Sequence, residues 1–162
     1  MDFLYNLPLS PELLTLILAM LPVTELRFSI PFALQVLNLP IWSAFLWSIL
    51  GDIIPAILII YFIGPISQVL RKNFKSADRF FSWLFAKTRR RFDSGYATWG
   101  KIALMFFVAI PLPGTGAWTG SIAAWLFDIS KKESIFYITA GVILAGILVT
   151  LISLGLFSFF NL

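Results

Sequence analysis

The sequence contains no cysteine and no histidine among its 162 residues. The absence of cysteine excludes disulfides, thiolate metal sites, iron–sulfur clusters and cysteine nucleophiles. The absence of histidine excludes a Ser–His–Asp triad, an H-E-x-x-H zinc site and a phosphohistidine mechanism. We therefore expect no metal, no cofactor and no enzymatic activity, since carboxylates, arginines, lysines and hydroxyls alone would have to supply any catalysis.

Charge is also scarce, because only 12% of the residues are charged while 59% are apolar, and the mean hydropathy is +0.91. A soluble domain has about 25% charged and about 45–50% apolar residues. The net charge of +4 is small and localised, so we expect no nucleic-acid partner. The composition predicts an all-α integral membrane protein, with residues 1–162 forming a single membrane domain.

Four apolar stretches cover residues 13–37, 41–63, 102–127 and 134–160. A membrane span needs about 20 apolar residues. The second and fourth stretches meet this requirement directly: the fourth contains no charged residue, and the second contains only Asp52. We expect each of these two stretches to cross the membrane once.

The first and third stretches are interrupted by residues that break helices. The predicted breaks are Pro22, Pro31, Pro111 and Pro113, the last two within the run PLPGTG. Two half-length helices that enter and leave on the same side, a re-entrant hairpin, would fit such a stretch, provided that the break is buried in protein or faces a watery cavity. A kinked but continuous span is the alternative.

The distribution of basic residues favours the hairpins. Nine of the twelve Lys and Arg lie in the connector between the second and third stretches, and Lys131 and Lys132 precede the fourth stretch. If both interrupted stretches are re-entrant, these eleven residues lie on one side of the membrane. The positive-inside rule then places the connector in the cytoplasm and both termini outside.

The two halves of the chain repeat the same order of elements. Residues 1–64 and 101–162 each contain an interrupted stretch followed by a span, and residues 65–100 connect them. Pro22 matches Pro111 at an offset of 89, and Gly51 matches Gly141 at an offset of 90. With one crossing per half, the halves must have opposite orientations. The sequence therefore predicts an inverted repeat of the kind found in transporters.

The connector shows apolar residues at helical spacing, with basic residues between them; the apolar positions are Ile66, Val69, Leu70, Phe74, Ala77, Phe80, Phe81 and Leu84. This pattern is typical of an amphipathic helix lying on anionic lipids. The alternative is a cytoplasmic helical hairpin that packs on itself. We interpret the basic run at 89–92 as a topology anchor.

Three ionisable residues are expected at membrane depth: Glu25, Arg27 and Asp52. Each costs about 2.5–3.5 kcal/mol to insert at a helix centre, so such residues are usually functional. We expect extended backbone at the first tip to point Glu25 and Arg27 the same way. Glu25 and Asp52 are candidates for proton or monovalent-ion coupling. Arg27 either binds substrate or only pairs with one of the two carboxylates.

The PLPGTG run predicts a half-helix that begins at membrane depth, with Thr115 as its N-cap. Helix N-termini and an arginine together suit an anion such as phosphate. We therefore expect substrate to be bound by Arg27 and by four residues of the second tip: Gly114, Thr115, Gly116 and Thr119.

The strings PVTELRFSIPFAL, WSILGD and FVAIPLPGTGAWTGS resemble those of putative small multidrug export proteins. That family is more distantly similar to the DedA superfamily of lipid and polyprenyl-phosphate translocases. The resemblance implies a prokaryotic cytoplasmic membrane, two facing re-entrant hairpins, and proton coupling at Glu25 and Asp52. The chain departs from DedA proteins at 112–120, where it has none of their second-hairpin arginines.

The favoured hypothesis is a transporter or lipid translocase that moves an amphiphilic, anionic, phosphate-bearing substrate with proton or ion coupling. Proton-coupled efflux of cationic amphiphilic drugs is one alternative, and a structural or membrane-assembly factor is another. An intramembrane aspartyl protease is disfavoured, because Ile49 replaces the first glycine of G-x-G-D and a second membrane Asp is absent. Since two spans enclose little, we expect a homo-oligomer, with a dimer favoured.

Overall fold

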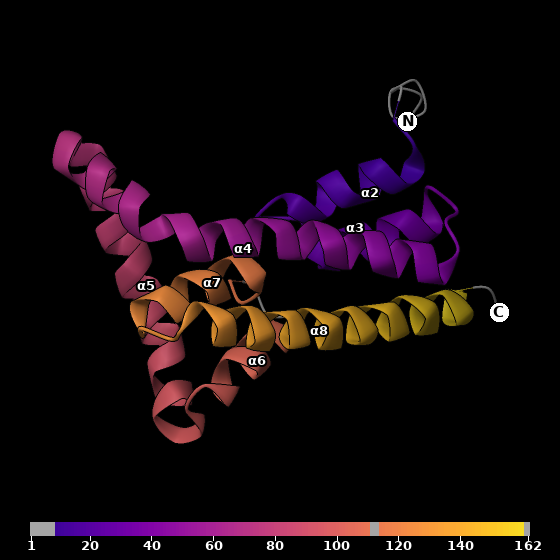
Figure 1. The fold of residues 1–162 in the computed structure, drawn as a ribbon. Coiled ribbons are helices and arrows are strands. Elements are labelled where there is room, and N and C mark those ends of the chain that lie inside the picture. Colours follow the sequence, from indigo (N-terminus) through magenta and orange to yellow (C-terminus); the bar gives the residue numbers. More distant parts are fainter. Residues whose placement is uncertain (1–8, 111–113, 161–162) are drawn as a thin grey trace.

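The computed structural model describes residues 9–110 and 114–160. Within these ranges the chain forms seven helices and no strand. Two helices are long and apolar enough to cross a membrane, α4 (Ile41–Asn73) and α8 (Lys131–Phe160). Figure 1 shows α4 and α8 side by side and antiparallel. Within the described ranges, this confirms the predicted all-helical fold and the prediction of two helices long and apolar enough to span a membrane.

Each of the two interrupted stretches forms a pair of short helices. The first pair is α2 (Pro11–Met20) and α3 (Glu25–Gln35), and the second is α6 (Ile102–Ala109) and α7 (Ala117–Leu126). In Figure 1 the pairs approach from opposite ends of α4 and α8, and the turns within each pair meet near the middle. These meeting ends are called the two tips below: the first tip is residues 21–27, and the second comprises, among the described residues, Ile110 and residues 114–116.

The prolines do not all break helices. Pro22 lies in the turn between α2 and α3, as predicted, but Pro31 lies inside α3, so its prediction as a break is wrong. A proline within a helix removes only one backbone hydrogen bond. Burial of Ile30 and Ala33 on either side of it keeps the helix packed. Pro111 and Pro113 lie outside the described residues.

Two glycines of the long helices allow the first helix of each pair to pack closely. Gly51 of α4 contacts α2, and Gly141 of α8 contacts α6. A Cβ atom added at Gly51 would overlap the Leu16 carbonyl oxygen of α2 and lie 2.7 Å from Ala19 Cβ. A Cβ atom added at Gly141 would lie 2.7 Å from both the Met105 carbonyl oxygen of α6 and Val108 Cβ. Leu16 and Ala19 precede Met105 and Val108 by the offset of 89 that relates the two prolines. The two halves therefore repeat a contact as well as an order of elements.

The connector does not form one helix that starts at Pro65. Instead α4 continues through Pro65 to Asn73, and the chain turns at Phe74 into α5 (Lys75–Trp99). Arg71 near the end of α4 pairs with Asp78 in the first turn of α5 at 2.7 Å. The amphipathic helix predicted from the apolar positions 66–84 is therefore interrupted at Phe74, and this corner has the character of the alternative, a helical hairpin.

Aromatic side chains fix α5 to the second helix pair. Phe92 is 1% exposed, and its ring lies 5.4 Å from Phe107 of α6 and 5.0 Å from Phe127, centroid to centroid. Phe85 lies 5.0 Å from Trp125 of α7. Aromatic pairs at these distances contribute beyond their buried area. Much of the apolar face of α5 is thus used within the protein, although Phe80 remains exposed.

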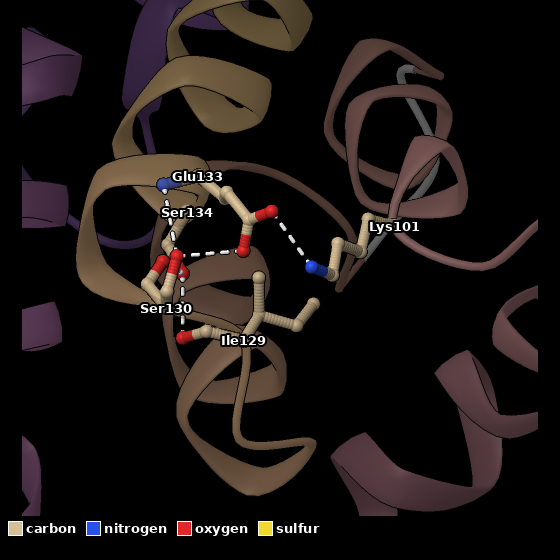
Figure 2. Close-up of polar contacts among 5 residues, drawn as sticks. All are labelled: Lys101, Ile129, Ser130, Glu133 and Ser134. Atoms are coloured by element: carbon tan, nitrogen blue, oxygen red, sulfur yellow. Dashed lines mark hydrogen bonds and ion pairs between the residues drawn. The ribbon is translucent and has the colours of Figure 1, made fainter.

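Polar contacts fix the start of α8 (Figure 2). The Ser130 hydroxyl donates to Glu133 at 2.6 Å and accepts from the Glu133 backbone N–H at 3.5 Å, an arrangement close to a capping box. The Lys101 ammonium, in the turn before α6, donates to Glu133 at 2.7 Å, and this hydrogen bond raises the pKa of Lys101. The residue just before α6 is thereby joined to the start of α8, which follows α7.

Candidate functional site

Glu25 is the first residue of α3 and lies at the first tip. Only 6% of it is exposed, although it carries an ionisable group. Its backbone φ of +47° lies in the left-handed region, which is uncommon for residues other than glycine. Such conformations cost free energy and cluster at functional sites. The strain makes Glu25 a candidate functional residue independently of its charge.

The Glu25 carboxylate lies against the second tip, at the start of α7. It accepts a hydrogen bond from the backbone N–H of Trp118. A Cβ atom at Gly116 would lie 2.7 Å from Glu25 Oε1 and would overlap Oε2. The first N–H groups of a helix have no partner within the helix, and its dipole favours an anion there. The N-terminus of α7 is therefore occupied by a carboxylate of the protein itself.

Arg27 also joins the two tips. Its Nη2 donates to the Thr115 carbonyl oxygen at 2.8 Å, to the Thr115 hydroxyl at 3.0 Å and, more weakly, to the Ile110 carbonyl oxygen at 3.5 Å. Its Nε lies 3.9 Å from Glu25 Oε2, a loose ion pair within one tip. Arg27 is part of a helix here, so the expected extended backbone between Glu25 and Arg27 is wrong.

Thr115 is not the N-cap of α7; Gly116 is. The Thr115 hydroxyl instead donates to the Ile110 carbonyl oxygen at 2.7 Å and accepts from Arg27. The hydroxyl therefore makes one hydrogen bond within the second tip and accepts another from the first tip. The capping prediction failed because the side chain has a stronger, charge-assisted partner across the tip.

Asp52 lies on α4 beside the two tips and is 1% exposed. Its carboxylate interacts electrostatically with both Glu25 and Arg27. Within the part of the chain that the structure describes, Asp52 Oδ1 has no hydrogen-bond partner. One turn earlier, the Ser48 hydroxyl accepts from Ser29 of α3 at 2.7 Å, which holds α3 against this face of α4. Glu25, Arg27 and Asp52 are called the charged cluster below.

The remaining two predicted substrate ligands lie apart from the charged cluster. Gly114 and Thr119 face α5, where they line a small cavity together with Arg91. In the sequence, Arg91 stands out only as part of the basic run at 89–92, the predicted topology anchor. The signal that distinguishes Arg91 is its helical phase, because Lys87 and Arg91 are four residues apart and share a face of α5. Neither Arg89 nor Arg90 lines this cavity.

The chemistry of the charged cluster differs from the predicted anion cradle. The N-terminus of α7 is already filled by Glu25, and Arg27 donates to main-chain and hydroxyl oxygens of the second tip. What the cluster offers in addition is a buried carboxylate oxygen, Asp52 Oδ1. This oxygen is an acceptor without a hydrogen-bond donor among the described residues. No group of three or more metal-ligand residues occurs among the described residues.

Comparisons with known proteins agree with a membrane location for this site. A family model described as "Putative small multi-drug export protein" matches residues 25–148. The matched range begins at Glu25, the first residue of α3, and contains the second tip, α4, α5 and more than half of α8. No curated protein and no solved structure matches the chain.

Proposed function

The chain belongs to the family of putative small multi-drug export proteins, and we propose that it exports small amphiphilic cations in exchange for protons. The observation that carries this proposal is the charged cluster, in which two buried carboxyl groups and one arginine join two helical tips. Ionisable residues at membrane depth are costly and usually serve a substrate or proton pathway.

Protonation of Glu25 would change the contact between the tips. As a carboxylate, Glu25 makes a charge-assisted hydrogen bond to the Trp118 N–H and a loose ion pair with Arg27. A neutral carboxyl group loses most of the attraction to the α7 N-terminus and to Arg27. The two tips are then held mainly by Arg27 and Thr115. Proton uptake therefore favours separation of the tips, which is the movement that an alternating-access transporter requires.

The architecture supports the same proposal. We propose that both helix pairs are re-entrant hairpins and that the two halves form an inverted repeat, with the tips near the membrane midplane. The matching contacts of Gly51 and Gly141 support the repeat. Transporters with inverted repeats bind substrate at the midplane, where discontinuous helices meet. Because two spans enclose little, we also propose a homo-oligomer.

The groups of the charged cluster that already have hydrogen-bond partners favour one sign of substrate charge over the other. A substrate anion would have to displace Glu25 from α7 and Thr115 from Arg27. Asp52 Oδ1 has no hydrogen-bond partner among the described residues, so a cation bound there would break neither contact. The geometry thus supports the cationic alternative at this site better than the phosphate-bearing substrate.

Flux measurements in proteoliposomes test this proposal. With a pH gradient imposed, we expect accumulation of a lipophilic cationic dye such as ethidium, and collapse of that accumulation when a protonophore is added. An anionic dye of similar size should show no pH-driven flux. Transport of the anionic dye alone would reject cation export, and the absence of pH-driven flux of either dye would reject the proton-coupled exporter.

We propose that the protein lies in the prokaryotic cytoplasmic membrane, with α5 and the start of α8 on its cytoplasmic side and both termini on the outer side. The chain has no native cysteine, so single cysteines introduced at Asn6, Lys87, Lys131 and Asn161 report cleanly. We expect positions 87 and 131 to react only after the membrane is permeabilised, and positions 6 and 161 to react in intact cells. Labelling of positions 87 and 131 from opposite sides would contradict the re-entrant hairpins.

Arg27→Gln is expected to reduce both stability and export. It removes two hydrogen bonds to Thr115 and leaves the buried Glu25 and Asp52 without their nearby cation. A buried group left unsatisfied costs about 1–3 kcal/mol. The double variant Arg27→Gln with Glu25→Gln should lose less stability than the two single variants lose in total. Thermal unfolding in detergent can measure all three losses.

Arg71→Gln is the matched control for that measurement. Its ion pair with Asp78 is shorter, at 2.7 Å, but exposed, so its loss should cost at most about 1 kcal/mol and leave export unchanged. Strictly additive effects of Arg27→Gln and Glu25→Gln would contradict the buried pair. Restored pH-driven export in the double variant would show that Glu25 only neutralises Arg27 and does not carry protons.

A further inference from the structure

Besides the small cavity that Gly114 and Thr119 line, a larger cavity lies between α5 and α6. It has a volume of about 390 Å³, and its lining is apolar apart from one guanidinium: Phe92, Trp99, Ala103, Phe106, Phe107, Ile110 and Arg91. Trp99, Phe106 and Ile110 are exposed on the outer surface of the protein. Pockets of this size and composition, with few polar groups, are typical of small-molecule sites.

Arg91 also lines a smaller, more polar cavity of about 90 Å³ between α5 and the second tip. Lys87, Thr88, Gly114 and Thr119 contribute to the same cavity. A Cβ atom at Gly114 would lie 2.9 Å from Arg91 Cζ, so the glycine provides the room that the guanidinium occupies. Lys87 Nζ lies 4.4 Å from the Trp83 ring centroid. Two cations therefore lie one helical turn apart beside an apolar cavity.

We propose that these adjoining cavities form a binding site for an anionic membrane lipid. The apolar cavity would hold part of an acyl chain, and Arg91 with Lys87 would bind the phosphate of the headgroup. Arginine suits this role because its planar fork donates two parallel hydrogen bonds to a phosphate. Thr88 and Thr119 supply further hydroxyl donors at the polar end.

Charge and exposure select a lipid over the other possible occupants. An exported cation would be repelled by Arg91 and Lys87, and a free phosphate would leave the apolar cavity unused. The exposed Trp99, Phe106 and Ile110 open the cavity toward the surroundings of a membrane protein, where lipid is the available amphiphile. The site does not share side chains with the charged cluster, so the inference does not depend on the proposed cation export.

The site can be tested with the purified protein in a neutral detergent, using thermal unfolding as the readout. We expect short-chain phosphatidylglycerol to raise the melting temperature saturably. Phosphatidylcholine with the same chains and inorganic phosphate should have little effect. Arg91→Gln should weaken the phosphatidylglycerol response at least about tenfold in half-saturating concentration, since a charge-assisted hydrogen bond is lost. Arg90→Gln, the same change one residue earlier and outside both cavities, should not.

Ala103→Leu tests the apolar part separately, because it fills the cavity without changing charge. We expect it to reduce the response to phosphatidylglycerol while Arg90→Gln retains the response. Equal losses in Arg90→Gln and Arg91→Gln would overturn the site in favour of a diffuse basic surface. A response to inorganic phosphate equal to that of the lipid would assign a phosphate site instead. Cation flux in Arg91→Gln, measured alongside, separates failure of this site from failure of the export proposal.

Discussion

Glu25→Gln and Asp52→Asn are each expected to yield folded protein in which export no longer responds to a pH gradient. Both changes keep the shape of the side chain while removing its ability to bind and release a proton. Because Glu25 and Asp52 interact with each other and with Arg27, loss of either changes the charge of the whole cluster. We expect pH-driven flux to fall by two orders of magnitude or more, about the contribution of a positioned proton-transfer group.

Asp93→Asn is the control for these variants, since Asp93 is an exposed carboxyl group on α5, away from the charged cluster. It should retain normal flux. Thermal unfolding in detergent must accompany the flux measurement, so that misfolded variants are recognised. Normal pH-driven flux in both Glu25→Gln and Asp52→Asn would reject proton coupling at the charged cluster.

Gly116→Ala is expected to be strongly destabilising. Gly116 has a φ of +127°, which is strained for any L residue, and the added methyl group would overlap the Glu25 carboxylate. The backbone strain alone costs about 1–3 kcal/mol. Displacement of a buried carboxylate from the Trp118 N–H adds to this cost. We expect a large fall in melting temperature and loss of export.

Two further variants separate the strain from the overlap. Gly100 also has a positive φ, +57°, but nothing lies within 4 Å of an added Cβ atom, so Gly100→Ala incurs the strain alone. Gly116→Ala should therefore be clearly worse than Gly100→Ala. Combining Gly116→Ala with Glu25→Ala removes the overlap and should recover part of the stability but not export. Equal effects of Gly116→Ala and Gly100→Ala would show that Glu25 does not lie against Gly116.

The long helices were predictable because they depend on local properties of the sequence. An uninterrupted apolar run of more than 20 residues has few alternatives to a spanning helix. Pro22 was also predicted correctly as a helix break. It lies in an exposed turn, where no packing compensates for the hydrogen bond that a proline removes. Pro31, Pro55 and Pro65 are all accommodated within helices because tertiary contacts outweigh one lost hydrogen bond. Such contacts cannot be read from spacing alone.

The members of the charged cluster were predictable as residues, but their partners were not. Charges at membrane depth are rare enough that Glu25, Arg27 and Asp52 stand out in any reading of the sequence. Which hydroxyl or helix end each of them contacts depends on how two tips 89 residues apart fit together. Arg27 and the N-terminus of α7 do lie close together, as the predicted anion cradle requires, but Glu25 occupies that N-terminus, and Gly114 and Thr119 face α5. Arg91 was missed because its significance comes from Gly114, a distant residue without a side chain.

The fit between the two tips has a consequence for the origin of the fold. At the offset of 89 that relates the two halves, Glu25 corresponds to Gly114 and Arg27 corresponds to Gly116. The Glu25 side chain thus lies against Gly116 of the other tip, and Arg27 contacts Thr115 beside that glycine. Two copies of the first half would oppose like charges with no glycine to admit them, and two copies of the second half would provide no charge at all. If a duplication produced this chain, the present cluster arose only after the two copies had diverged, and an ancestor built from identical halves must have used a different site.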